Sequence, residues 1–196
     1  MALEVKFNLC ETVSCTKLEF TDQTGTYNIL TNPGGYDQIN EVPNQPGTNE
    51  FLEATLTIIT PSNTSYDFDI FPTFPTVNTE TVYYVTASAL GFGTSPISDG
   101  VYQVTYTLST DLQTYTVSKY YLFTCQVNCC IDKLYSKVTP DNGCCDCENS
   151  YLKAAIEAEG YVCAAKNALA CGKIALAKNL LAKAQSICSN LKCKCS

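Results

Sequence analysis

Residues 1 to 124 alternate apolar and polar positions with a period of two, which is typical of half-buried β-strands. The alternation is clearest at the start, where Leu3, Val5, Phe7 and Leu9 are separated by polar residues. Further strands are expected over 15–20, 51–60, 65–71, 81–87, 100–108 and 113–124. Clusters of Pro, Gly and Asn separate these segments, and no helical period intervenes. The pattern predicts an antiparallel β-sandwich or barrel.

The hydrophobic period changes after Phe123. Apolar residues recur at helical spacing from 126 to 138, and the Pro-Asp-Asn-Gly sequence at 140–143 ends this helix. Two helices rich in Ala, Leu and Lys are expected over 148–170 and 173–191, joined at Cys171-Gly172, where glycine suits a helix C-cap. The fold class is therefore predicted to be α+β, with a β-sandwich domain at 1–124 and a Cys-rich helical tail at 125–196.

One strand carries a more specific signal. The sequence from Asp99-Gly100 to Tyr106 resembles the tyrosine-corner strand of immunoglobulin-like domains, in which a tyrosine hydroxyl bonds back to the backbone. Asp-Gly followed by a tyrosine also occurs before ordinary hairpins. An immunoglobulin-like arrangement is therefore one form that the predicted sandwich can take.

The composition excludes several kinds of active site. The chain has no His, no Arg and no Trp. A Ser-His-Asp or Cys-His catalytic site is therefore excluded, as is an arginine clamp on phosphate. Chemistry based on Lys or a carboxylate would need a motif, and none is seen. We expect a protein without enzymatic activity.

Charge is scarce and unevenly distributed. Charged residues make up 16% of the chain, and the formal net charge is −7. Residues 1–124 carry three Lys against thirteen acids, and residues 125–196 carry nine Lys against six. Nucleic acid repels an acidic half, and the Lys residues of the tail are spread out, so no nucleic-acid contact is expected. The neutral polar surface suits packing against other chains.

No targeting or membrane segment is expected. The N-terminal sequence lacks a basic region followed by an apolar stretch, and no window approaches the roughly 18 apolar residues of a membrane span. We therefore expect synthesis in the cytoplasm, without a signal peptide, a transmembrane segment or a membrane partner.

Cysteine is concentrated in the tail, where eleven of the 13 cysteines lie after residue 124. Three interpretations stay open. Thiolates can hold a structural zinc ion without any histidine, cysteines can form disulfides after assembly or lysis, and buried free thiols can act as small hydrophobic groups. A reactive, catalytic cysteine is the least favoured, because no His or Arg is present to lower a thiol pKa.

The predicted hairpin suggests which cysteines meet. If the chain turns near residue 172, positions equidistant from the turn face each other, so the start of one helix meets the end of the other. The first candidate metal cluster therefore comprises Cys144, Cys145, Cys147, Cys193 and Cys195. Either zinc or disulfides there would staple a hairpin that is too small to be stable alone.

A second candidate cluster lies where the last strand becomes the first helix. Cys125 and Cys129 are four residues apart, on one helical face, and Cys130 follows. Cys163 on the antiparallel second helix is the expected fourth member. Neither cluster has the spacing of a zinc ribbon with paired C-x2-C motifs.

The layout of the second half resembles the small Cys-rich virion proteins of tailed bacteriophages, and is similar to those of crAss-like phages. The likeness covers about residues 95 to 196 and is one of organisation. It rests on the segments Asp99-Gly100-Val101-Tyr102 to Tyr121, Cys125 to Leu134, Cys144-Cys145-Asp146-Cys147 and Cys193-Lys194-Cys195. The resemblance implies a structural protein of the virion, in a ring at the portal, neck or tail, whose partners are itself and other virion proteins.

Two other functions stay open from the residues alone. The Tyr-bearing sandwich suits an adhesion or glycan-binding module. The many thiols also allow a metal-binding storage protein, although cysteines set among helix-forming Ala and Leu favour fixed structure over a loose metal cluster.

Overall fold

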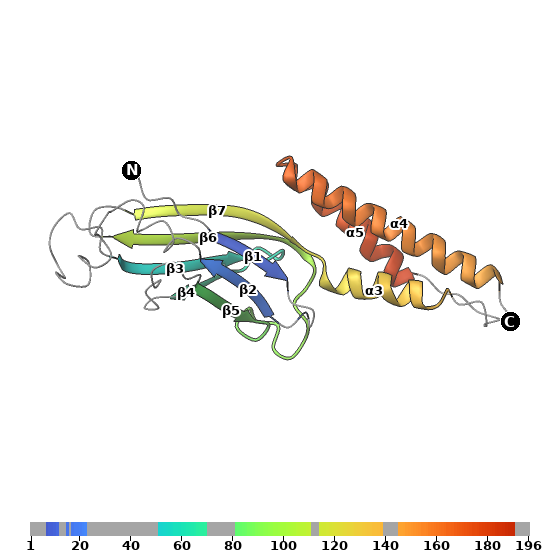
Figure 1. Ribbon diagram of the computed structural model, residues 1–196, viewed down its shortest axis with the longest axis horizontal. Helices are drawn as coiled ribbons and strands as arrows, with labels where there is room; N and C mark the ends of the chain where they lie inside the picture. Colours follow the sequence, from blue (N-terminus) through green and yellow to red (C-terminus); the bar gives the residue numbers. More distant parts are fainter. Residues whose placement is uncertain are drawn as a thin grey trace. The chain divides into compact units, whose positions relative to one another are not determined.

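The computed structural model describes residues 7–11, 15, 17–22, 51–69, 81–110, 114–138 and 145–190. The chain divides into two compact units (Figure 1). We call residues 1–97 and 102–120 the β unit, and residues 98–101 and 121–196 the helical unit. The domain boundary expected after residue 124 stays a prediction.

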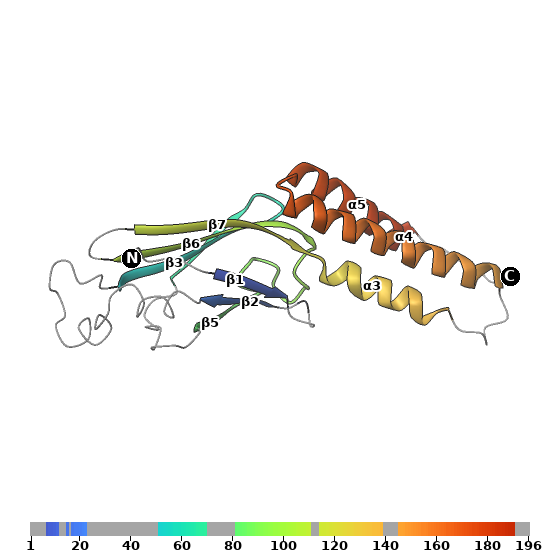
Figure 2. The same cartoon turned by 45° about the horizontal axis from the view of Figure 1, so that its top comes forward.

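Seven strands are described, and they form two sheets. The sheet orders are β1-β2-β5 and β4-β3-β6-β7, and the pairs β1–β2, β2–β5, β3–β4 and β3–β6 are antiparallel. Figure 2 shows β3, β6 and β7 running alongside one another. The strands are β1 (Phe7–Glu11), β2 (Lys17–Asp22), β3 (Phe51–Ile59), β4 (Ser65–Asp69), β5 (Thr81–Thr86), β6 (Gly100–Thr110) and β7 (Thr114–Phe123).

The register of β3 and β6 explains the alternation in the sequence. Leu56 pairs with Tyr106 and Ile58 pairs with Val104, and all four side chains are buried. Burying a side chain of this size stabilises the fold by about 1.5–3 kcal/mol. The intervening Thr57 points to the other face of the sheet, where hydroxyl groups are frequent. The four-stranded sheet therefore has one apolar face and one polar face.

The polar face is linked by hydrogen bonds between side chains. The Thr57 hydroxyl donates to the Asp67 carboxylate at 2.7 Å. The Thr105 hydroxyl and the Gln103 amide both donate to Ser118 Oγ, at 3.0 and 3.3 Å. Such exposed cross-strand pairs each contribute little, on the order of 0.2–1 kcal/mol. They give this face an ordered hydroxyl surface.

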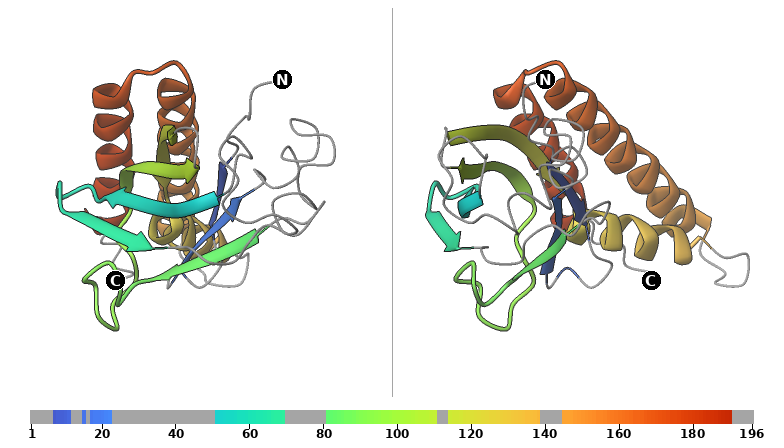
Figure 3. Two further views of the ribbon diagram at one scale, coloured as in Figure 1. Left: turned by 90° about the vertical axis from the view of Figure 1, so that its left-hand side faces the viewer. Right: turned by 60° about the vertical axis from the view of Figure 1, so that its left-hand side comes forward.

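The helical unit contains three helices, α3 (Cys125–Ser136), α4 (Cys145–Ala170) and α5 (Ile174–Asn190). α4 and α5 form an antiparallel hairpin, seen side by side in Figure 3. The turn between them contains Gly172 with a φ of +71°. The amide of Lys173 donates to the Ala168 carbonyl at 2.9 Å, and that of Gly172 to the Leu169 carbonyl at 2.8 Å. This is the Schellman motif, so the predicted glycine C-cap is confirmed.

Alanine dominates the seam between α4 and α5. The buried side chains repeat at spacings of three and four residues, which places them on one helical face. Small side chains allow the two helix axes to approach closely, while α3 adds larger residues such as Val127 and Ile131. The buried residues of the hairpin are Ala154, Ala155, Ala158, Val162, Ala165, Ala168, Ala177, Leu181 and Ala184.

The predicted α+β class is confirmed: an antiparallel four-stranded sheet is followed by three helices. The predicted strands over 51–60, 65–71, 81–87, 100–108 and 113–124 correspond to β3 to β7. Residues 3–6 of the first predicted strand lie outside the described residues. Within the described ranges, no helix combines the length and the apolar character that crossing a membrane requires.

Candidate functional site in the helical unit

Asp99 caps the first helix of the helical unit from a distant point in the sequence. One of its carboxylate oxygens accepts the backbone N–H of Gln126 at 2.9 Å, and the other accepts that of Val127 at 2.6 Å. These are the second and third residues of α3, whose amides have no partner within the helix. Thr124 stands at the N-cap position without capping, since its hydroxyl accepts from Asn128. Asp99 therefore provides the capping hydrogen bonds that Thr124, at the N-cap position, does not make.

The Asp99 carboxyl is buried, and this changes its acidity. Burial raises the pKa of Asp99 above its ordinary value, although the two backbone N–H donors pull in the opposite direction. The negative charge also sits at the positive end of the helix dipole. The cap therefore carries a desolvation cost that protonation relieves.

A disulfide joins the first and the last helix of the helical unit. Cys130 of α3 is bonded to Cys188 of α5, across a separation of 58 residues. Sequence reasoning did not pair these two cysteines, because the pairing depends on how α3 is rotated against α5. The disulfide lies in a part of the core where the surrounding side chains include Leu134, Tyr151 and Ile187.

An open hollow of about 410 Å³ adjoins this disulfide. Its lining includes the capped helix start, the Asp99 carboxylate and both bonded cysteines. Ser98, Gln126, Gln185 and Ser189 supply further polar groups. The hollow gives solvent a route to the disulfide.

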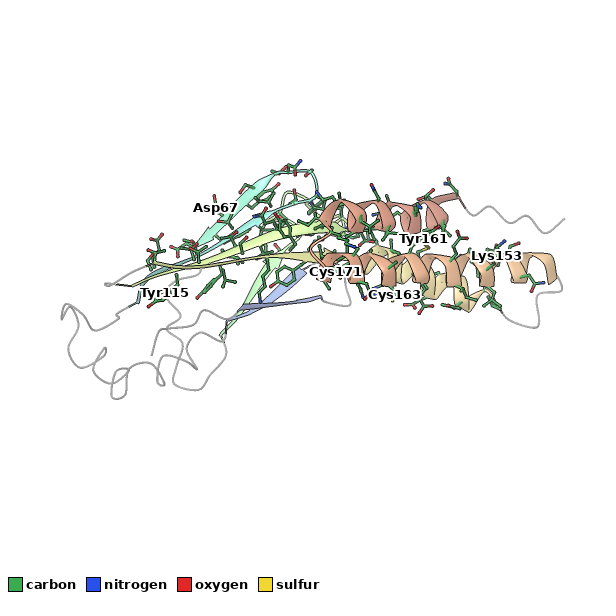
Figure 4. The ribbon with its side chains drawn as sticks, turned by 90° about the horizontal axis from the view of Figure 1, so that it is seen from above. Asp67, Tyr115, Lys153, Tyr161, Cys163 and Cys171 are labelled. Carbon is green, nitrogen blue, oxygen red and sulfur yellow. A yellow bond between two sulfur atoms is a disulfide. The ribbon has the colours of Figure 1, made fainter. Side chains whose placement is uncertain are left out.

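The remaining thiols of the second candidate cluster lie in different surroundings. Cys129 and Cys163 are free and exposed, and Cys125 is disulfide-bonded. Cys163 lies on the side of α4 away from α5 (Figure 4), where the Asn167 amide donates to its sulfur at 4.0 Å. Of the four cysteines, Cys125 and Cys129 are near neighbours on α3. The cluster as a set of zinc ligands stays a prediction.

Cys125 and Cys129 of α3 have their sulfur atoms within 4.8 Å of each other, as two ligands of one metal ion would be. Cys15 and Cys125 are both disulfide-bonded, and a sulfur in a disulfide is not a thiolate ligand. Cys15 was absent from both predicted clusters. The chain is thus cysteine-rich, and its described cysteines include both disulfide-bonded sulfurs and free thiols.

The first candidate cluster lies outside the described residues. Cys144, Cys193 and Cys195 fall in undescribed segments, while Cys145 and Cys147 belong to α4 with undescribed side chains. Whether they meet stays a prediction. Cys171, a free and exposed thiol at the turn after α4, was assigned to neither cluster.

Polar contacts on the surface link the helices to one another. The Tyr135 hydroxyl of α3 donates to a Glu159 carboxylate oxygen of α4 at 2.6 Å. This hydrogen bond to an anion raises the pKa of Tyr135, because losing the proton would break the bond and would place two negative charges together. On the hairpin, the Lys183 ammonium lies 5.3 Å from the centre of the Tyr161 ring.

The outward side of α4 exposes large apolar groups. Ile156 is 56% exposed and Leu152 is 36% exposed. Together with Asn149, Lys153 and Glu157 they border a shallow, mostly apolar hollow of about 430 Å³. A surface of this kind, apolar at its centre and charged at its edge, is typical of protein contacts. No family model matches the chain, and no curated protein or solved structure matches it.

Proposed function

We propose that the chain is a structural protein of a tailed-phage virion, without enzymatic activity, that acts by assembling into a ring at the portal, neck or tail. Its partners would be further copies of itself and other virion proteins. The proposal takes its virion setting from the likeness of layout over residues 95 to 196. It takes its mode of action from the surface of the helical unit.

The observation that carries the proposal is the exposed apolar side of α4. Ile156 and Leu152 are large aliphatic side chains on a helix whose opposite side is already buried against the rest of the helical unit. Leaving them in water forgoes about 25 cal/mol for each square ångström of apolar surface. Contact with another protein would recover this free energy.

The test is the oligomeric state of the purified full chain. Light scattering and negative-stain microscopy should show ring-sized assemblies, and mass spectrometry of purified virions should find the chain in many copies. A stable monomer at high concentration, together with its absence from virions, would reject the proposal.

Two finer features belong to the same proposal. The sheets of the β unit would form an immunoglobulin-like sandwich that presents its polar loops to neighbouring subunits. Thiols of the tail would hold structural zinc in the reducing cytoplasm, before the particle is released. Elemental analysis of protein purified without added zinc should then find about one or two zinc ions per chain.

A second candidate function is a glycan-binding module, and one observation favours it. Tyr120 is 45% exposed and shares a strand face with Ser118, which accepts hydrogen bonds from Thr105 and Gln103. An exposed aromatic ring beside hydroxyl and amide groups suits the alternating apolar and polar surface of a sugar. Binding to a glycan array that Tyr120→Ala abolishes would support this function over ring assembly.

A further inference from the structure

The exposed side of α4 is organised as a self-complementary surface. Asn149, Leu152, Ile156 and Gly160 are spaced three and four residues apart, so they follow one stripe along the helix. We call these four residues the α4 stripe. Gly160 is exposed, and a Cβ atom added there would meet nothing within 4 Å. This glycine weakens α4, and among the described residues no atom lies close enough to require the missing side chain.

Two opposite charges flank the stripe on the same edge. Lys153 and Glu157 are both exposed and four residues apart, and both border the apolar hollow. They also border a second hollow of about 340 Å³ on the side of α5, where Ile187 contributes. The pair therefore forms a charged ridge between two shallow depressions.

The order of these residues fits an antiparallel copy of the same helix. A register that sets Leu152 against Ile156 of the partner copy also sets Ile156 against Leu152 of the partner copy. In the same register Lys153 lies two residues from the level of Glu157 of the partner copy, and Asn149 lies one residue from the level of Gly160 of the partner copy. At a rise of about 1.5 Å per residue, these side chains are near enough to meet. Two-fold symmetry then repeats each of these contacts.

We propose that the α4 stripe binds the same stripe of a second copy, with the two α4 helices antiparallel about a two-fold axis. A two-fold interface requires a patch that complements itself, and this patch has an apolar centre, paired charges of opposite sign and one small residue facing a larger one. Gly160 then has a role, since its missing side chain lets the partner's Asn149 approach. The pairing deepens the proposed function by naming a second copy as what covers the apolar side of α4. It does not depend on ring formation, since the contacts within a ring would then lie on other surfaces.

The first experiment places a charge at the centre of the stripe. In sedimentation equilibrium of the full chain with free thiols blocked, Ile156→Asp should weaken pairing by about a hundredfold, because each copy would bury an unpaired carboxylate. Leu176→Asp is the matched control, since Leu176 is 46% exposed on α5 and outside the stripe. That variant should pair as the unaltered chain does.

The second experiment tests the register through its charges. Lys153→Glu and Glu157→Lys should each weaken pairing by about tenfold, because both variants replace two attractive contacts by two repulsive ones. The double variant K153E/E157K exchanges the charges and should restore pairing. Higher salt should reduce all of these differences, since exposed charges are screened. Circular dichroism verifies that each variant keeps its helices.

Several outcomes would overturn the pairing. It is wrong if the unaltered chain stays monomeric at about 100 µM, far above the dissociation constants of stable dimers, or if Ile156→Asp associates as tightly as Leu176→Asp. A double variant that stays as weak as the single ones would reject the antiparallel register. If the chain forms rings through other surfaces, Ile156→Asp should halve the assembly mass while leaving rings. Pairs without rings would reject the virion role and keep the pairing.

Discussion

The two units of the chain are stabilised by buried side chains of different size. The β unit buries large groups, such as Leu56, Ile58 and Tyr106, opposite one another on paired strands. The hairpin of the helical unit buries mainly alanine, which removes little apolar surface from water per residue. The helical unit adds a covalent bond and a buried carboxylate cap. The comparison shows that the helical unit, whose alanine core is thin, contains a disulfide between two of its own helices and a charged helix cap.

The largest expected effect comes from truncating a large buried side chain of the β unit. Leu56→Ala should lower the free energy of unfolding of the β unit by about 2–5 kcal/mol, through lost burial and the cavity left behind. Hydrogen exchange of the β3 amides under mild denaturant measures it. Leu176→Ala, at an exposed position, should change stability by less than about 0.5 kcal/mol. Equal effects would mean that the large side chains do not hold the β unit.

Removing the disulfide between Cys130 and Cys188 tests how much this bond stabilises the helical unit. The double variant C130S/C188S should destabilise the helical unit by about 2–4 kcal/mol, because the bond restricts a loop of 58 residues in the unfolded chain. Denaturation followed by circular dichroism at 222 nm reports the helices. Cys163→Ser alters a free, exposed cysteine and should have almost no effect. A stable double variant would show that the alanine seam suffices alone.

Removing the cap should have a smaller effect. Asp99→Ala leaves two amides of α3 unpaired and should cost about 1–3 kcal/mol, whereas Asp67→Ala loses only an exposed contact with Thr57. The pKa of Asp99 is raised in the folded state, so its protonated form is favoured there. The part of the stability that is linked to this protonation is therefore complete below the ordinary pKa and is lost as the pH rises through the folded pKa, in addition to the hydrogen bonds of the cap. Asp99→Asn should remove this part of the pH dependence; an unchanged profile would contradict it.

The smallest effect distinguishes two glycines of the hairpin. Gly160→Ala should stabilise α4 by about 0.5–1 kcal/mol, because the helix interior has room for a Cβ atom. Gly172→Ala should instead destabilise by about 1 kcal/mol, since the φ of +71° strains any residue with a side chain. Measurement below the concentration of self-association separates helix stability from pairing. Destabilisation by Gly160→Ala under these conditions would reveal a contact within the chain.

Local patterns predicted most of the described secondary structure. The alternation around Ile58 and Val104 depends on only a few neighbouring residues, and Cys171-Gly172 is a local capping signal; both were confirmed. The Asp99 cap was missed because it joins positions 27 residues apart. The available signal in the sequence was an aspartate directly before an apolar strand; only the structure shows that Thr124 is engaged by Asn128.

The cysteine pairing could not be predicted for a different reason. Positions equidistant from a turn indicate which residues of α4 and α5 lie at the same height, but α3 enters by a separate connection. The bond from Cys130 to Cys188 depends on the rotation of α3 about its own axis, which its buried Val127 and Ile131 determine. Periodicity alone leaves that rotation undetermined.

The Asp99 cap also has a consequence for the order of folding. The carboxylate precedes α3 in the sequence, and β6 and β7 occupy most of the chain between them. During synthesis Asp99 leaves the ribosome before α3 exists, and pairing of β6 with β7 returns the chain to it. Pairing of β6 with β7 has then already offset the entropy cost of closing the loop between Asp99 and α3. The first turn of α3 would form upon an anion already in place, which makes the strand pair the template on which the helices nucleate.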